Sequence, residues 1–76
     1  MKIEIYGTGC PKCKTLFENT QKALADLNLA ADLSKVEDIN RITNAGIMFT
    51  PALSIDGQVK SAGKVLSVEE IKKIIS

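Results

Sequence analysis

The chain carries Cys10-Pro11-Lys12-Cys13 directly behind the short apolar run Ile3-Glu4-Ile5-Tyr6, and this stretch decides its fold. Two thiols three positions apart can close a small disulfide ring and open it again, and the thiolate is the form that attacks. Pro11 fits the first turn of a helix, where its missing N–H costs nothing. Cys10 then falls at the N-cap, where unpaired N–H groups and the helix dipole stabilise an anionic sulfur. The motif therefore predicts dithiol–disulfide exchange.

Length and composition limit the choice of fold and partner. The chain has 76 residues, which is enough for one small domain, and we expect that domain to span residues 1–76. Hydrophobic residues make up 45% of the chain, as in ordinary globular proteins, so disorder is not expected. Ten basic and nine acidic residues give a net charge of +1, which predicts neither a nucleic acid nor an anionic membrane as partner.

The first residues contain no apolar stretch long enough for a signal peptide or a membrane span. The sequence therefore predicts a cytoplasmic protein. In that compartment a lone cysteine pair is typically catalytic, redox-active or metal-binding, and seldom a structural disulfide.

The region around the cysteines reads as a strand followed by a helix. Residues Lys2 to Tyr6 alternate polar and apolar, and Gly7-Thr8-Gly9 ends that strand. From Pro11 onward, apolar residues recur every three or four positions as far as Leu27, and Cys13 is in phase with them. We therefore expect Cys13 to face the core and Cys10 to stay accessible at the helix tip, as resolving and attacking thiols require.

The rest of the chain predicts an α/β fold in the order strand, helix, strand, helix, strand, strand, helix. The first two strands should be parallel and the hairpin antiparallel, which makes a four-stranded mixed sheet with helices on both faces. The signals are a strand at Ala30–Val36, a short helix capped by Asp38, a hairpin of Ala52–Ile55 and Gln58–Ala62 around Asp56-Gly57, and a capping box at Ser67-Val68-Glu69-Glu70.

With these features the chain resembles the thioredoxin fold in its shortest, glutaredoxin-like form. The resemblance covers nearly the whole chain, and it is closest to the small redox-active disulfide proteins of archaea and bacteria. It rests on the CxxC after the first strand, on Thr50-Pro51 before the hairpin, and on Gly63 after it. It implies a minimal thioredoxin fold with a cis Thr50–Pro51 bond beside the cysteines. Thr50 and Pro51 would then form the platform on which a substrate segment binds.

The resemblance also implies roles for the two cysteines. Cys10 would attack a substrate disulfide, and Cys13 would resolve the mixed disulfide to leave Cys10–Cys13 oxidised. The alternative is a pair of inert, half-buried thiols. Lys12 and Lys14 either lower the pKa of Cys10 through their charge or are ordinary solvated helix lysines.

Glu4 stands six residues before Cys10, the offset at which thioredoxins carry a buried acid that handles the proton of the resolving cysteine. A carboxylate buried in a central strand would have a raised pKa, which suits proton transfer. The alternative is an ion pair with Lys2 or with a lysine of a neighbouring strand.

Other residues near the cysteines are candidate substrate contacts. Pro11 and Lys12 lie within the motif, and Tyr6 and Phe49 flank the two loops that should meet there; the alternative for the two aromatic residues is a place in the core. Gly63 would allow close approach of a peptide or of glutathione, or would only end the hairpin. Glutathione use is in doubt, because glutaredoxin sites resemble Cys-Pro-Tyr-Cys with a later Gly-Gly pair, which this chain lacks.

The sequence thus favours a thiol–disulfide oxidoreductase that acts without a cofactor. Its partners would be disulfide-containing protein substrates and an upstream reductase, and we expect a monomer. A second hypothesis is a metallochaperone, or another domain that binds soft metals, in which the two thiolates hold an ion such as Cu(I). A closed zinc site within one chain is disfavoured, because there are two cysteines and no histidine. A third reading is a redox sensor whose disulfide state changes its binding to a partner.

Overall fold

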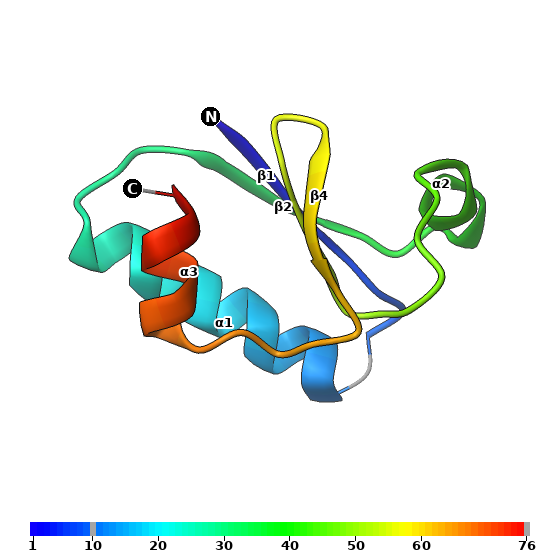
Figure 1. Cartoon of the computed structure of the whole chain (residues 1–76), viewed down its shortest axis with the longest axis horizontal. Helices are drawn as coiled ribbons and strands as arrows, with labels where there is room; N and C mark the ends of the chain where they lie inside the picture. The colour runs from blue at the N-terminus through cyan, green and yellow to red at the C-terminus, as the bar shows by residue number, and fades with distance from the viewer. Residues whose placement is uncertain (10, 76) are drawn as a thin grey trace.

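The computed structural model describes residues 1–9 and 11–75, and the strands in these ranges form one sheet (Figure 1). Its strands are β1 (Lys2–Tyr6), β2 (Asp32–Val36), β3 (Ala52–Ile55) and β4 (Gln58–Ala62), in the spatial order β2-β1-β3-β4. β1 pairs parallel with β2 and antiparallel with β3, and β3 pairs antiparallel with β4. The predicted mixed sheet is confirmed.

Three helices lie on the two faces of this sheet: α1 (Pro11–Asp26), α2 (Ile39–Asn44) and α3 (Val68–Ile75). Side chains alternate along β1, so Ile3 and Ile5 point to one face and Glu4 and Tyr6 to the other. Figure 1 shows α1 and α3 next to one another, with α2 at the far end of the molecule. The element order and the placement of helices on both faces agree with the prediction of a minimal thioredoxin fold.

Each face of the sheet has its own core. Under α1 and α3, the fully buried Ile3 packs with Leu16 of α1 and Ile71 of α3. Under α2, Tyr6 packs with Ile42. The remaining buried members are Ile5, Ala23, Leu24, Leu53, Ile55, Leu66 and Ile75 in the first core, and Val36, Ile47 and Ala52 in the second.

β2 begins two residues later than the sequence predicts. Leu29, just before the predicted start, donates its N–H to the carbonyl of Leu24 and so still belongs to the end of α1. Pairing with β1 starts only where Lys2 faces Asp32, because β1 itself begins at Lys2. The strand therefore runs from Asp32, and the prediction of Ala30 as its start is wrong.

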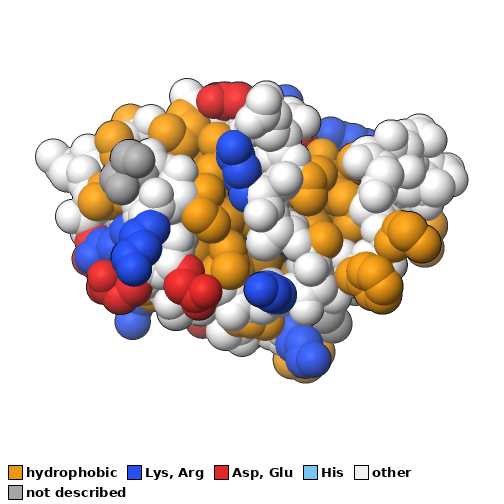
Figure 2. All heavy atoms as spheres, viewed as in Figure 1, with side chains coloured by type: hydrophobic (Ala, Val, Ile, Leu, Met, Phe, Trp, Pro, Cys, Tyr) orange, Lys and Arg blue, Asp and Glu red, His pale blue; other side chains and the backbone are white. Residues whose placement is uncertain are grey.

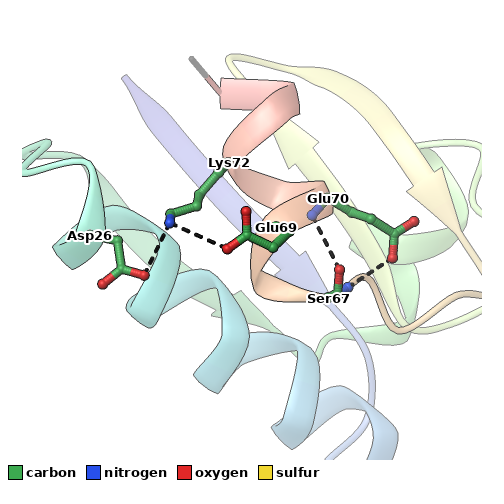
Figure 3. A network of polar contacts seen from close by, with 5 residues as sticks. All are labelled: Asp26, Ser67, Glu69, Glu70 and Lys72. Atoms are coloured by element: carbon green, nitrogen blue, oxygen red, sulfur yellow. Dashed lines mark hydrogen bonds and ion pairs between the residues drawn. The ribbon is translucent and has the colours of Figure 1, made fainter.

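The predicted capping box holds the start of α3 (Figure 3). The N–H of Glu70 donates to Oγ of Ser67 at 3.2 Å, and the N–H of Ser67 donates to Oε1 of Glu70 at 3.1 Å. One turn further, Nζ of Lys72 lies 3.3 Å from Oδ2 of Asp26 and 3.5 Å from Oε1 of Glu69. The ion pair between Lys72 and Asp26 ties α3 to α1, which carries Cys13.

The capping box predicts a pH-dependent contribution to stability. Two hydrogen bonds with Ser67 hold the pKa of Glu70 below its ordinary value of 4.5. The bond from the backbone N–H has the larger effect, and the bond with the hydroxyl has the smaller one. This contribution is therefore present above about pH 4.5 and is lost as the pH falls through the folded-state pKa. We expect Glu70→Gln to lower the free energy of unfolding at neutral pH and to lose that difference in acid, as measured by urea unfolding. A Glu18→Gln variant, also on an exposed surface, serves as the control; an equal pH profile for the two variants would contradict the prediction.

Within the described ranges, every helix is too short or too polar to cross a membrane.

Candidate functional site

Cys13 lies in the first turn of α1 with its side chain turned inward. The helix begins at Pro11, as the sequence predicts, and Cys13 is only 6% exposed. The expectation that Cys13 follows the apolar face of α1 is confirmed. Cys10, the predicted nucleophile, lies outside the described residues.

Gly7, which follows β1, lies directly against Cys13 of the cysteine motif. Its N–H donates to the carbonyl of Val36 at 3.0 Å, which fixes it at the end of β1. A methyl group placed on Gly7 would overlap Sγ of Cys13 and would lie 3.0 Å from Cβ of Cys13 and 4.0 Å from Cα of Pro51. Cys13 therefore packs directly against Gly7, and Pro51 lies close to the same residue.

Sequence reasoning treated Gly7 only as the end of a strand. The available signal was its position, because a glycine between a buried strand and a reactive motif often marks a close approach of backbone to another group.

The Thr50–Pro51 peptide bond is cis, as the resemblance implies. Pro51 is buried and Thr50 is exposed. The carbonyl of Pro51 accepts the N–H of Gly63 at 2.9 Å, and Gly63 has the positive φ of +77° that favours glycine. A methyl group on Gly63 would lie 3.0 Å from Cβ of Phe49. Phe49, Pro51 and Gly63, which the sequence analysis names as candidate substrate contacts, are therefore close together.

Phe49 projects from the molecule. It is 67% exposed and its neighbour Met48 is 86% exposed, so the alternative that Phe49 belongs to the core is wrong. Tyr6, by contrast, is 7% exposed and does belong to the core. Figure 2 shows apolar side chains on the surface at the end of the molecule that carries α2, where Ile39 is also exposed. An apolar surface thus directly precedes Thr50 and Pro51.

Glu4 lies on the α2 face of β1 and is 8% exposed. Its Oε2 lies 3.1 Å from a guanidinium nitrogen of Arg41, and its Oε1 accepts the hydroxyl of Tyr6 at 3.3 Å. Burial, followed by the charge of Glu4, raises the pKa of Tyr6 above its ordinary value. The ion pair expected for Glu4 therefore exists, but its partner is Arg41, because α2 covers this face.

Cys13 belongs to α1, which packs on the opposite face of the sheet from Glu4. The structure therefore does not bring these two predicted residues to the same side of β1. The role of Glu4 in handling the proton of Cys13 stays a prediction.

Removing the partner of Glu4 should be costly. We expect Arg41→Met to lower the free energy of unfolding by about 1–2 kcal/mol, since the buried carboxylate then loses its cationic partner and, within the described part of the chain, keeps the hydroxyl of Tyr6. The expected loss is small because the side chain of Arg41 is 59% exposed and its charge is screened by solvent. Urea unfolding measures the difference, and Lys22→Met on the exposed side of α1 is the control. A cost no greater than that of the control would contradict the importance of the pair.

A pocket of about 90 Å³ opens beside Cys13. It is lined by Cys13 and Lys14 from α1, by Ile5, Gly7 and Gly9 from β1 and its following loop, and by Lys35 and Glu37 from β2 and the residue after its end. Sequence reasoning named neither Lys35 nor Glu37 as a site residue. The signal that could have found them is topological, because the carboxyl ends of parallel neighbouring strands meet at one edge of a sheet. Lys12 is exposed near the start of α1.

The family model of the thioredoxin domain matches residues 1–76 of this chain. The chain belongs to the thioredoxin domain family. A thioredoxin of Methanothermobacter thermautotrophicus is 45% identical over 76 residues, which are 100% of this chain and 99% of that protein. A thioredoxin of Methanocaldococcus jannaschii is 44% identical over 71 residues, or 93% of this chain and 81% of that protein.

An uncharacterised 9.0 kDa protein of Acidithiobacillus ferrooxidans is 32% identical over 72 residues, which cover 91% of this chain and 84% of that protein. As a member of the thioredoxin family with two relatives that are thioredoxins, the chain is a thiol–disulfide oxidoreductase.

Proposed function

We propose that the protein exchanges electrons with protein disulfides through a Cys10–Cys13 redox pair. The thiolate of Cys10 attacks one sulfur of a substrate disulfide and releases the other as a thiolate. Sγ of Cys13 then attacks Sγ of Cys10, the Cys10–substrate bond breaks, and the second substrate sulfur leaves. The substrate gains two electrons, and Cys10–Cys13 becomes a disulfide that an upstream reductase reduces again.

The observation that carries this proposal is the packing of Cys13 against Gly7, with Pro51 close to the same glycine. A resolving thiol needs to be held in a fixed place beside the bound substrate, and Cys13 is buried against Gly7, whose Cβ position lies 4.0 Å from Cα of Pro51. We infer that a substrate segment binds across Thr50 and Pro51 and contacts Phe49, Gly63, Pro11 and Lys12. The exposure of Phe49 supports a contact with an apolar substrate side chain.

The proposal includes a monomeric, cytoplasmic protein that uses no cofactor. The alternative of a copper-binding module is less well supported, since ferredoxin-like copper domains end in a strand whereas this chain has α3 after β4.

A redox titration of the purified protein tests the proposal. The protein is equilibrated in glutathione and dithiothreitol buffers of graded potential, and its thiols are counted by mass after alkylation. We expect one reversible two-electron transition, with Cys10 alkylated before Cys13 in the reduced form. If no transition occurs and tightly bound metal protects both thiols, the metal-binding reading replaces this one. Slow turnover combined with redox-dependent binding to one protein would instead favour the redox sensor.

A further inference from the structure

The helix α2 depends on the sheet for its place in the molecule. It has six residues, all of them described, whereas isolated helices shorter than about 12 residues are marginal in water. Figure 1 shows α2 at the opposite end of the molecule from α3, so α3 gives it no support. Of the described residues of α2, Ile42 alone is buried, and it packs with Tyr6 in the second core. One apolar side chain is a small attachment for a helix.

The ion pair between Arg41 and Glu4 is a second attachment of α2 to the sheet. A guanidinium nitrogen of Arg41 lies 3.1 Å from Oε2 of Glu4. Glu4 is a fixed partner, because it belongs to the central strand β1, is 8% exposed and also accepts the hydroxyl of Tyr6. Ile42 and Arg41 thus hold neighbouring positions of α2 against the same strand.

The chain that leaves α2 leads directly to the proposed substrate platform. The N–H of Gly46 donates to the carbonyl of Thr43 at 3.0 Å, and the N–H of Ile47 donates to the carbonyl of Ile42 at 3.2 Å. Ile47 is then buried in the second core. The next three residues, 48–50, are exposed and end at the cis peptide bond. The position of α2 therefore determines where this exposed segment starts.

The far end of the same segment is held by the hairpin. The carbonyl of Pro51 accepts the N–H of Gly63 at 2.9 Å, and a methyl group on Gly63 would lie 3.0 Å from Cβ of Phe49. Residues 48–50 are thus held between α2 on one side and the hairpin on the other. A segment of three residues has little slack, so a loosened α2 changes the place of its exposed apolar side chains.

We propose that Arg41 is a positioning residue for substrate binding: its pairing with Glu4 holds α2 against β1 and so keeps residues 48–50 in place for a protein substrate. The inference rests on the proposed function, which places the substrate on this segment and on Pro51. It gives the buried carboxylate of Glu4 a task on the α2 face of the sheet, the face opposite the resolving cysteine.

The kinetics of Arg41→Met, in the full chain with both cysteines, test this role. We expect the KM for insulin to rise by about two- to five-fold, because apparent affinity falls with the fraction of molecules whose binding segment is in place. The kcat should stay unchanged, since the cysteines are untouched. The rate with hydroxyethyl disulfide should also stay unchanged, because this substrate is too small to use the segment.

Two further variants examine the pair itself. Arg41→Lys keeps the positive charge, and the contact uses one nitrogen, so its KM should lie between those of the parent and Arg41→Met. Glu4→Gln should raise the KM much as Arg41→Met does, and combining the two changes should add little. A full, additive effect of each change would overturn the inference. An effect of Glu4→Gln confined to the pH profile of the cysteines would also overturn it.

Lys72→Met is the matched control. It removes the ion pair between α3 and Asp26 and should lower the stability of the protein, but it leaves α2 attached. The KM for insulin should therefore stay at the parent value, measured at a temperature where circular dichroism shows every variant folded. If Lys72→Met raised the KM as much as Arg41→Met, general loss of stability would be the cause, and the inference would be wrong.

Amide hydrogen exchange, followed by nuclear magnetic resonance, gives a readout that does not depend on the cysteines. The N–H groups of Gly46 and Ile47 both donate to carbonyls of α2, so they should exchange faster in Arg41→Met and not in Lys72→Met.

The outcomes separate the two proposals. If a folded Cys10→Ser protein kept full reductase activity, the proposed function would fail and this inference with it. If Cys10 is the nucleophile but Arg41→Met leaves the KM and the amide exchange unchanged, the present inference alone fails.

Discussion

Cys10→Ser is expected to lower the rate of disulfide reduction by roughly a thousand-fold or more, because a serine hydroxyl is not ionised at neutral pH and cannot attack a disulfide. Cys13→Ser should fail differently. Cys10 can still attack, but the mixed disulfide with the substrate then lacks its intramolecular resolving thiol and accumulates. Insulin with dithiothreitol as reductant serves as the assay, and mass measurement after acid quenching detects the mixed disulfide.

The two cysteine variants are compared with Lys22→Met, a change on the exposed side of α1, purified and assayed in parallel. Circular dichroism shows whether each variant keeps the helices and the sheet. Substantial activity of a folded Cys10→Ser protein would contradict the proposed nucleophile. Accumulation of the mixed disulfide in Cys10→Ser instead of in Cys13→Ser would reverse the assignment of the two roles.

Gly7→Val should have the second large effect. A single methyl group at Gly7 would already overlap Sγ of Cys13, and valine adds two more carbon atoms at the same place. We expect overpacking to lower the free energy of unfolding by about 1–3 kcal/mol. Because the resolving sulfur must move away, release of substrate from the mixed disulfide should also slow by about a hundred-fold. Urea unfolding and single-turnover quenching measure the two effects.

Gly9→Ala is the matched control for this prediction. Gly9 also lines the pocket, but among the described residues beyond its two chain neighbours no heavy atom lies within 4 Å of the place its methyl group would occupy. Its φ of +83° disfavours alanine, so the variant should lose about 1 kcal/mol of stability with no slowing of resolution. If Gly7→Val and Gly9→Ala slowed the resolution of the mixed disulfide equally, the conformation of the loop would be the cause, and the contact between Gly7 and Cys13 would not.

Local signals in the sequence were sufficient to predict most of the fold. Asp38 caps α2 by accepting the N–H of Asn40, and Ser67 and Glu70 form the predicted box at α3. At the hairpin, Asp56 and Gly57 both have positive φ, which the Asp-Gly pair favours. Each of these features depends on residues within a few positions of one another, so it can be predicted from a short stretch of sequence.

The site was harder to predict because its contacts join distant parts of the chain. Nothing near Glu4 in the sequence indicates Arg41, which reaches it only because α2 lies over that face of β1. The contact of Lys35 with Phe17 likewise depends on how β2 packs beside α1. Phe49 is apolar and therefore suggests the core, yet it is exposed and lies in the bend that precedes β3.

The central place of β1 has a consequence for how the protein is made. β1 is synthesised early, yet it pairs with β3 and its Ile3 packs against Ile71 of α3, both of which leave the ribosome much later. The nascent chain therefore cannot complete the core beneath Cys13 until α3 has emerged. During that interval the cysteines are exposed to cellular oxidants and to the thiols of other proteins. We expect chains arrested before α3 to form mixed disulfides that the completed protein does not retain.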